Sequence, residues 1–128
     1  MSRDPVRAAR LIYRIAAIYG LIVLLPLFLA EDLIARQAPP AITHPEYFYG
    51  FLGAASVMQL FYLVVAGDPL RFRPMMPITV LAKLNFVAVV AILFLQGRLG
   101  AATLPLPALD LVIGIAFAWA WLRLRRLP

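Results

Sequence analysis

An ionisable side chain inside an apolar segment is the first feature of this sequence that could do chemistry. Lys83 lies about eight residues into the apolar segment 75–96, which places it roughly 12 Å along a helix. An ionisable group at that depth in a membrane is a candidate functional residue, because lipid cannot solvate its charge. Gln59 lies about eight residues from the end of the preceding apolar segment, 47–66. The two side chains therefore share a level, and we expect them to form a polar cluster between the two segments.

Two further polar residues belong to the same pair of segments. Ser56 lies about one turn from Gln59 on the same helical face. Asn85 lies two residues from Lys83 and so points about 200° away from it, toward a different contact. We treat all four as candidates for binding a ligand or a partner helix. The alternative is that Lys83 extends to the headgroups, while Gln59 and Asn85 hydrogen-bond between helices for about 1 kcal/mol each.

A second group of titratable residues lies at the opposite ends of the segments, which we call the outer mouth. His44 and Glu46 precede segment 47–66, and Asp110 lies near the start of segment 104–122. If the three converged, they could supply acid–base catalysis on a hydrophobic substrate. Structural roles are favoured instead: Glu46 completes a capping box with Thr43, and Asp110 meets the positive end of a helix dipole. Catalysis is not expected here.

Four apolar segments must position these residues. The chain has 128 residues, of which 64% are apolar and 14% charged, whereas soluble domains have about 25% charged residues. The segments are apolar on all sides, and this favours helices over the alternating strands of a barrel. We predict an all-α polytopic membrane protein, a single domain over residues 1–128 that forms a bundle of four transmembrane helices. The spans are expected at about 11–30, 47–66, 75–96 and 104–122.

The distribution of arginine predicts the orientation of this bundle. Nine basic residues fall on one side against two acids, Asp4 and Asp68. They are Arg3, Arg7, Arg10, Arg14, Arg71, Arg73, Arg123, Arg125 and Arg126. The positive-inside rule then places both termini in the cytoplasm, N-in and C-in, with these arginines at the lipid headgroups. The net charge of +6 is explained in this way, and nucleic acid is not expected as a partner.

The composition also limits cofactors and suggests possible partners. With no cysteine and one histidine, the sequence predicts no metal site and no cofactor. Gly50, Gly53 and Ala54 form a small-residue patch of the kind that lets helices approach closely. The expected partners are membrane lipid and either a second copy of the chain, in a homo-oligomer, or another membrane protein.

Several segments resemble a set of small, largely uncharacterised four-span bacterial inner-membrane proteins. The resemblance rests on residues 44–51 (HPEYFYGF), Gln59, residues 68–76 (DPLRFRPMM) and Lys83-Leu84. In that set an acid often precedes the lysine, and Ala82 stands at that position here. In architecture alone the chain is also similar to DoxX-like proteins and to the emopamil-binding-type fold, whose members hold hydrophobic ligands with intramembrane acids and a histidine. With no acid or histidine expected at mid-membrane, an isomerase activity does not carry over.

Together these observations favour a non-enzymatic function in the bacterial inner membrane. We expect a small multi-pass protein that binds lipid, a hydrophobic small molecule or a partner span at the cluster around Lys83 and Gln59. One alternative is a small transporter or channel subunit that works as an oligomer. The other is a membrane enzyme that acts on a hydrophobic substrate at the outer mouth.

Overall fold

Four long helices make up most of the structure, a computed structural model that describes residues 4–128. They are α1 (Asp4–Leu27), α3 (Pro45–Gly67), α4 (Met76–Leu95) and α5 (Pro105–Leu124). Short 3₁₀ turns precede the last two, η1 (Arg73–Met75) before α4 and η2 (Ala101–Thr103) before α5. All four long helices are long and apolar enough to cross a membrane. The predicted all-helical fold with four helices of membrane-spanning length is therefore confirmed.

The first helix extends well beyond its apolar segment. α1 is already helical at Asp4, about two turns before the predicted span begins. Hydropathy marks the part of a helix that suits lipid, whereas arginine and alanine are themselves good helix formers and continue the helix toward the N-terminus. Arg7, Arg10 and Arg14 therefore lie on the first turns of α1 itself and are exposed.

The connection between the first two spans contains a helix that was not predicted. α2 (Glu31–Gln37) begins with two acids and ends with Arg36, and these charges complement the dipole of even a short helix. The predicted capping box after it is wrong. His44 occupies the N-cap of α3 and makes no side-chain cap bond, because Pro45 takes the first helical position, which its fixed φ favours.

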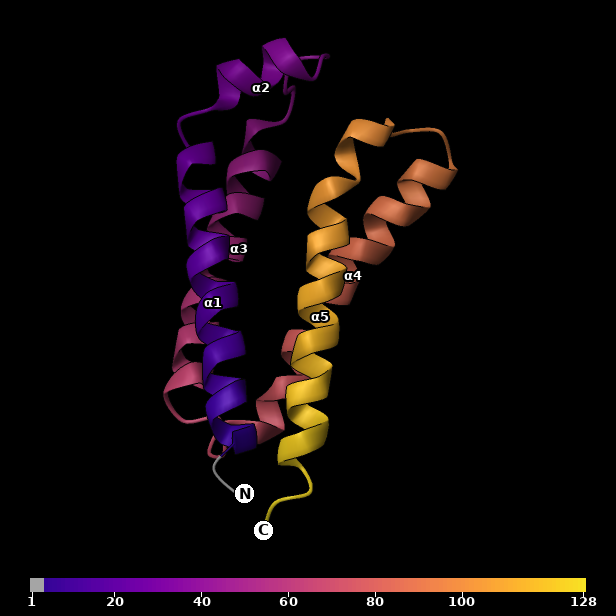
Figure 1. The fold of residues 1–128 in the computed structure, drawn as a ribbon. Helices are drawn as coiled ribbons and strands as arrows, with labels where there is room; N and C mark the ends of the chain where they lie inside the picture. The colour runs from indigo at the N-terminus through magenta and orange to yellow at the C-terminus, as the bar shows by residue number, and fades with distance from the viewer. Residues whose placement is uncertain (1–3) are drawn as a thin grey trace.

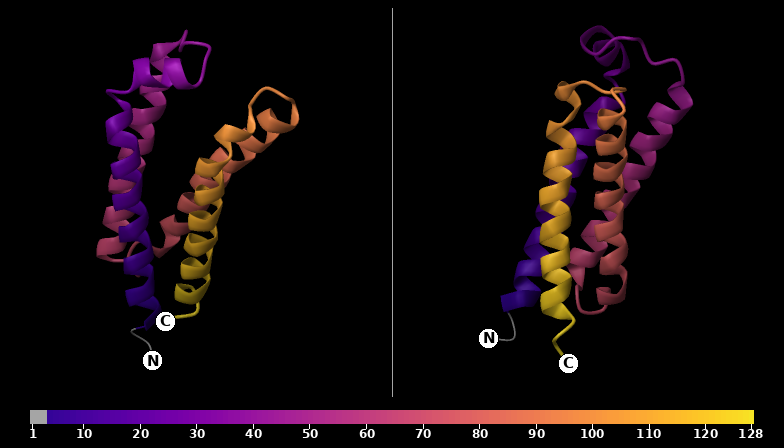
Figure 2. Two further views of the ribbon diagram at one scale, coloured as in Figure 1. Left: turned by 45° about the horizontal axis from the view of Figure 1, so that its top comes forward. Right: turned by 90° about the vertical axis from the view of Figure 1, so that its right-hand side faces the viewer.

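The helices are arranged as two antiparallel pairs that separate toward one end. α1 packs along α3, α4 packs along α5, and α1 also contacts α5. Figures 1 and 2 show the two pairs close together where the termini lie and spread apart at the end that carries α2. The α3–α4 connection lies at the same end as both termini (Figure 1). We call this the terminal end and the other the α2 end.

A layer of aromatic side chains joins the two pairs where they meet. Tyr13 of α1 stacks on Phe117 of α5, with ring centroids 4.1 Å apart and planes 3° from parallel. The ring of Tyr62, from α3, meets both edge-on, at 6.1 and 5.0 Å. The Tyr13 hydroxyl hydrogen-bonds Thr79 Oγ1 of α4 at 2.6 Å, so the buried phenol keeps a polar partner. This aromatic layer (Tyr13, Tyr62, Phe117, with Thr79) ties all four helices together.

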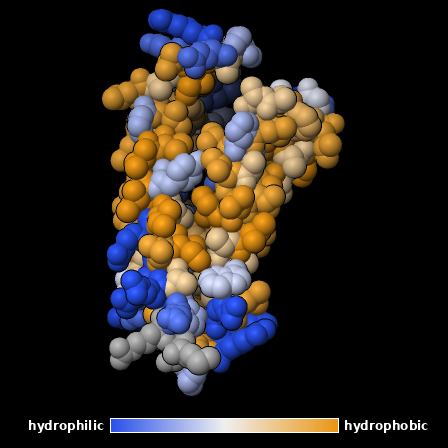
Figure 3. Space-filling model, viewed as in Figure 1, coloured by the Kyte–Doolittle hydropathy of each residue, from blue (hydrophilic) through white to orange (hydrophobic). Residues whose placement is uncertain are grey.

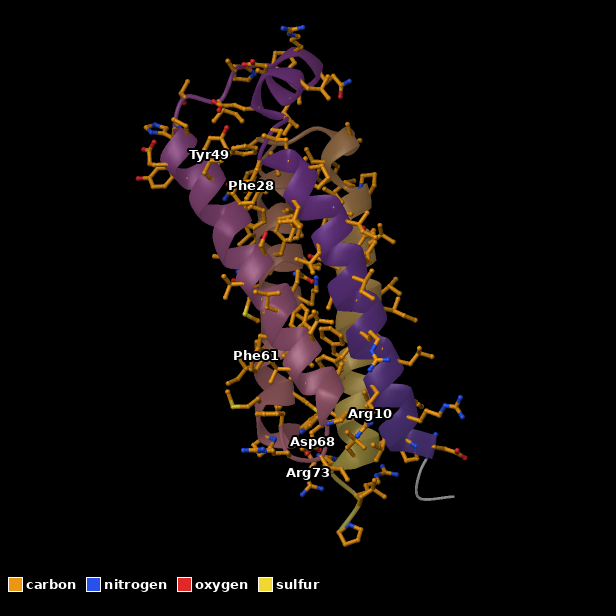
Figure 4. The ribbon with its side chains drawn as sticks, turned by 90° about the vertical axis from the view of Figure 1, so that its left-hand side faces the viewer. Arg10, Phe28, Tyr49, Phe61, Asp68 and Arg73 are labelled. Carbon is orange, nitrogen blue, oxygen red and sulfur yellow. The ribbon has the colours of Figure 1, made fainter. Side chains whose placement is uncertain are left out.

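The α3–α4 connection is held to the C-terminus of α5. Asp68 Oδ1 accepts a hydrogen bond from the Arg71 backbone N–H at 3.2 Å, and this caps the turn. One guanidinium nitrogen of Arg73 donates to the carbonyls of Leu124 and Leu127 at 3.0 and 2.9 Å, which satisfies acceptors that a helix end leaves free. Figure 4 shows Asp68 and Arg73 at the terminal end with Arg10, far from Phe28 and Tyr49.

The outside of the bundle is apolar around its middle. Large side chains such as Ile22, Val57, Leu81 and Val112 are 64–68% exposed, a degree of exposure that water would disfavour. In Figure 3 a hydrophobic surface lies between more hydrophilic ends. A membrane is the solvent that this surface suits.

Candidate functional site

The lysine inside the bundle is paired with an acid from the neighbouring helix. Lys83 is 7% exposed, and its ammonium donates to Asp110 Oδ1 of α5 at 2.9 Å. Since Asp110 lies nearer the α2 end of the bundle than Lys83 does, the side chain extends away from the headgroups of the terminal end. The alternative that Lys83 reaches those headgroups is therefore wrong in this structure.

A glycine makes room for this ion pair. Gly114 follows Asp110 by four residues on α5, so the two positions lie on the same helical face. A Cβ added at Gly114 would lie 3.2 Å from Lys83 Cβ, which is closer than ordinary van der Waals contact. The stem of Lys83 thus passes α5 at Gly114, and its ammonium reaches the carboxylate one turn further along.

An aromatic face lies against the other side of the ammonium. Lys83 Nζ is 5.6 Å from the ring centroid of Tyr62, within the range of a cation–π contact. Tyr62 thus contributes both to the aromatic layer and to the wall around the ion pair. Burying two charges in a bundle carries a large desolvation cost, and the carboxylate and the ring are the groups that offset it for Lys83.

Gln59 fixes the contact between α1 and α3 rather than binding Lys83. Its Nε2 donates to the Ala55 carbonyl of its own helix at 3.0 Å. Its Oε1 is buried and has no hydrogen-bond partner among residues 4–128. The carboxamide lies against Gly20 of α1, where an added Cβ would overlap it. The helix-to-helix role considered for Gln59 is the one that this geometry supports.

A cavity of about 280 Å³ lies between the two helix pairs, beside the ion pair. Lys83, Asp110, Tyr62 and Tyr19 supply the polar wall around the ion pair, and Gln59 and Asn85 are the other polar side chains of the lining. Its other lining is mainly apolar, from residues such as Val23, Leu24, Leu27, Phe86 and Leu106. All five of these residues lie on the side of the ion pair toward the α2 end. The cavity therefore has a polar end deep in the bundle and an apolar part that extends away from it.

The cavity is bounded on two sides. Toward the terminal end the aromatic layer closes it, because Tyr13, Thr79 and Phe117 each lie one to two turns beyond the lining residues of their helices. Between α3 and α4 the rings of Phe51 and Phe86 stack at 5.9 Å. The face between α1 and α5 is hollowed in Figure 3, and hydrophilic atoms are visible within it. This face of the cavity therefore opens on the apolar outer surface of the bundle.

The acid–base group considered as an alternative at the outer mouth does not form. His44 Nδ1 and Glu46 Oε1 lie 3.2 Å apart, but their side chains are 67% and 62% exposed. Asp110 is bonded to Lys83 inside the bundle, so the three residues do not converge. The reason is that Asp110 lies in the second turn of α5, beyond the helix start to which it was assigned.

The remaining candidates lie outside the polar wall. Ser56 donates to the Leu52 carbonyl of its own helix at 2.7 Å. Asn85 contributes to the lining of the cavity but is exposed, in keeping with its opposite direction from Lys83. Gly50 and Gly53 contact nothing across the bundle, since a Cβ at either would meet no atom within 4 Å.

Eight of the described arginines gather at the terminal end, as expected from their positions in the sequence. Arg7, Arg10, Arg14, Arg71, Arg123, Arg125 and Arg126 are exposed and Arg73 is half-buried, while Arg3 lies outside the described residues. The guanidinium groups of Arg123 and Arg125 lie 5.3 and 5.2 Å from the rings of Trp119 and Trp121. This arrangement of arginine and tryptophan is typical of a membrane–water interface.

Two features of this region were not expected from the sequence, the pairing of Asp110 with Lys83 and the tether of α2. Asp110 was assigned to the outer mouth and no acid was expected at mid-membrane, whereas Asp110 lies within the bundle beside Lys83. The spacing of Asp110 and Gly114 could have indicated this pairing. The two residues are one helical turn apart, so the glycine leaves room for a lysine side chain that reaches the carboxylate. At the α2 end, the Tyr49 hydroxyl donates to Glu31 Oε2 at 2.6 Å and ties α2 to α3.

The fold and the site together define an all-helical bundle with four helices of membrane-spanning length and an ion pair in an internal cavity. Comparison with known protein families, with curated proteins and with solved structures gave no match. Within residues 4–128, no group of three or more His, Asp or Glu side chains is arranged to hold a metal ion. The chemistry of the site therefore has to be argued from the ion pair and the cavity.

Proposed function

We propose that this chain is a non-enzymatic, multi-pass protein of a bacterial inner membrane that binds an apolar small molecule between its two helix pairs. The ligand occupies the cavity beside Lys83 and Asp110. No covalent step is required of the protein. The ligand-binding hypothesis made from the sequence is kept, and its centre moves from the Lys83–Gln59 cluster to the Lys83–Asp110 ion pair.

The observation that carries this proposal is the cavity with its mainly apolar lining and the Lys83–Asp110 ion pair at its deep end. Small-molecule sites are concave and largely apolar, with a few polar groups that fix orientation, and span about 300–1,000 Å³. The cavity, at about 280 Å³, lies just below that range and suits a small ligand or one hydrocarbon chain. An ion pair kept inside a membrane bundle at considerable cost is also typical of functional residues.

The charge distribution supports the proposed orientation in the membrane. The described arginines of the terminal end number eight, and that end also carries Asp4 and Asp68. The α2 end has Arg36 and Arg98 together with Glu31, Asp32 and Glu46. Basic residues accumulate on the cytoplasmic side of inner-membrane proteins, so both termini are cytoplasmic. A hollow of about 660 Å³ at this end, lined by Arg7 and Arg10, is where anionic headgroups would bind.

Photolabelling tests the proposed binding site. The protein in lipid nanodiscs is irradiated with decanol that carries a diazirine in its alkyl chain, and the labelled residues are mapped by mass spectrometry. We expect labelling of cavity residues of α1 and α5 that an excess of plain decanol suppresses. Labelling confined to the outer surface, or not reduced by the competitor, would contradict the proposal.

Two matched variants of α4 make this test specific. Ala82 lines the cavity, whereas Ala88 is exposed and lies outside it. Ala82→Phe fills the cavity and should reduce the saturable labelling at least fivefold, while Ala88→Phe adds the same side chain on the lipid side and should leave it unchanged.

A second candidate function is a small transporter that works as an oligomer, with lipid or further copies of the chain as its partners. The buried Lys83–Asp110 pair is the observation that favours it, because intramembrane ion pairs often mark pathways. The aromatic layer would have to open for passage to the terminal end. Uptake of decanol-sized solutes into proteoliposomes, compared with empty liposomes, separates transport from binding alone.

A further inference from the structure

The polar end of the cavity is electrically neutral and offers both kinds of hydrogen-bonding group. Lys83 supplies N–H donors, and the Asp110 side chain, which is 20% exposed, supplies carboxylate oxygens. Only Oδ1 of this carboxylate bonds the ammonium, at 2.9 Å. A ligand that reaches the pair therefore meets a donor and an acceptor side by side.

This neutrality selects against charged ligands. A carboxylate or an ammonium on the ligand would add a third charge beside a pair that already compensates itself. An uncompensated charge in such surroundings is strongly disfavoured. The phosphate-bearing headgroup of an ordinary membrane lipid is excluded for the same reason, and it would also have to leave the membrane surface.

A simple hydrocarbon is disfavoured for the opposite reason. It would fill the apolar part of the cavity but would shield the free face of the ion pair without making any hydrogen bond to it. A buried polar group without a partner is costly, and more so when it carries charge. An ether accepts from Lys83 but offers nothing to Asp110. A hydroxyl group does both, because one oxygen accepts a hydrogen bond while its proton is donated.

We infer that the ligand is an uncharged, single-chain amphiphile whose terminal hydroxyl binds between Lys83 and Asp110, an inference that rests on the proposed function. Its hydrocarbon chain extends toward the α2 end, along the wall formed by α1. Between Gly20 and Leu27 the cavity lining follows α1 for seven residue steps, or about 10 Å. The hydroxyl is thus deep in the bundle, and the hydrocarbon chain points toward the membrane surface at the α2 end. A lipid of the adjacent leaflet has the reverse orientation, with its headgroup at that surface and its chains toward the middle of the membrane.

A probe series that differs only in its end group tests this inference. Photoreactive decanol is compared, in nanodiscs, with its methyl ether, decylamine and decanoate, each carrying the diazirine at the same carbon. Because a hydrogen bond to a charged group contributes more than a neutral one, we expect decanol to show at least about tenfold stronger saturable labelling of cavity residues. The ether and both charged probes should label these residues weakly.

Removal of the ion pair should abolish the preference for decanol. In the double variant Lys83→Met/Asp110→Leu both charges are replaced by apolar side chains, so no unpaired charge remains and the bundle should still fold. We expect decanol and its ether to label this variant equally. Ser56→Ala is the control, because Ser56 bonds only its own helix; here the tenfold preference should remain. Thermal unfolding of each variant confirms that the fold is retained.

The possible results separate the inference from the proposed function. Equal cavity labelling by decanol and its ether in the unmodified chain overturns the inference and leaves the proposed function standing. Stronger labelling by decylamine or decanoate also overturns it, since the site then prefers a charge. If no member of the series labels the cavity saturably, the proposed function fails together with the inference.

Discussion

Lys83 and Asp110 place opposite charges inside an apolar bundle, and each depends on the other. The ammonium and the carboxylate are 2.9 Å apart, with side chains only 9% and 20% exposed. Loss of one partner would leave the other charged and unpaired, whereas loss of both would leave an apolar contact. The pair therefore favours a specific arrangement of α4 on α5 rather than high stability.

This dependence predicts strong coupling between the two residues. Lys83→Met alone and Asp110→Leu alone should each lower the free energy of unfolding by about 3 kcal/mol, because each leaves a buried unpaired charge. The double variant should lie within about 1 kcal/mol of the unmodified protein. Reversible unfolding in detergent, followed by circular dichroism, measures the free energy of unfolding of the unmodified protein, the two single variants and the double variant. These four proteins form a double-mutant cycle. Additive losses in the double variant would mean that the two side chains act independently.

Both charged residues could be identified from the sequence as candidates, but they were assigned to different sites for a physical reason. Lys83 stands out because it interrupts an apolar segment on both sides. Asp110 lies close to the start of its segment, where an acid has an ordinary role beside the helix dipole. Whether Asp110 only complements the helix dipole or pairs with Lys83 can be decided only once the register of α4 on α5 is known. Gly114 fixes that register, and neither hydropathy nor helical spacing shows which helix a glycine faces.

At the scale of the elements, small residues determine how closely the helices approach. Ala9, Ala16, Ala17 and Gly20 form the buried face of α1 together with Tyr13, and they let α1 contact both α3 and α5. Without a hydrophobic driving force between helices in lipid, close packing of this kind is what holds a bundle together. At Gly20 there is no room for a side chain, because an added Cβ would overlap Gln59 of α3.

The contact between Gly20 and Gln59 gives a matched pair of glycine variants. Gly20→Ala should destabilise the protein by about 2 kcal/mol, because the added methyl overlaps a buried side chain. Gly50→Ala adds the same methyl where no atom lies within 4 Å and should be neutral or stabilising by up to about 1 kcal/mol. Adding Gln59→Ala to Gly20→Ala should recover part of the loss. Unfolding in detergent checks all three; equal effects at the two glycines would contradict the packing argument.

The four long helices could be predicted from the sequence, whereas α2 and the helix ends could not. A run of apolar residues that is long enough to cross a membrane has few alternatives to a transmembrane helix. In the connection from Glu31 to Glu46, seven helical residues carry no apolar periodicity long enough to recognise. The start of α3 was misplaced because Thr43 fits a capping pattern, while the fixed φ of Pro45 decides the first helical position.

At the scale of the whole molecule, the two ends of the bundle differ in both shape and charge. The terminal end is closed by the aromatic layer and surrounded by arginines, and the α2 end is spread open and carries three of the acids. A ligand bound as proposed would therefore have its polar partner on the side of the terminal end and open space on the side of the α2 end. The same asymmetry of charge supports the proposed orientation, in which the arginines of the terminal end face the cytoplasm.

The orientation can be tested without disturbing any native thiol, because the chain contains no cysteine. Single cysteines are introduced by Leu70→Cys and Pro128→Cys at the terminal end, and by Gln37→Cys and Gln96→Cys at the α2 end. All four positions are exposed. In intact cells whose outer membrane is permeabilised, a membrane-impermeant maleimide should label the two α2-end cysteines and spare the two terminal-end cysteines until the inner membrane is lysed. The positive-inside rule gives this result because eight described arginines surround the protected pair.

Labelling of Pro128→Cys and Gln37→Cys to the same extent in intact cells would mean that the helices do not cross the membrane in this order. Labelling of only the terminal-end pair would mean that the protein is inserted the other way round, with its cavity nearer the cytoplasm.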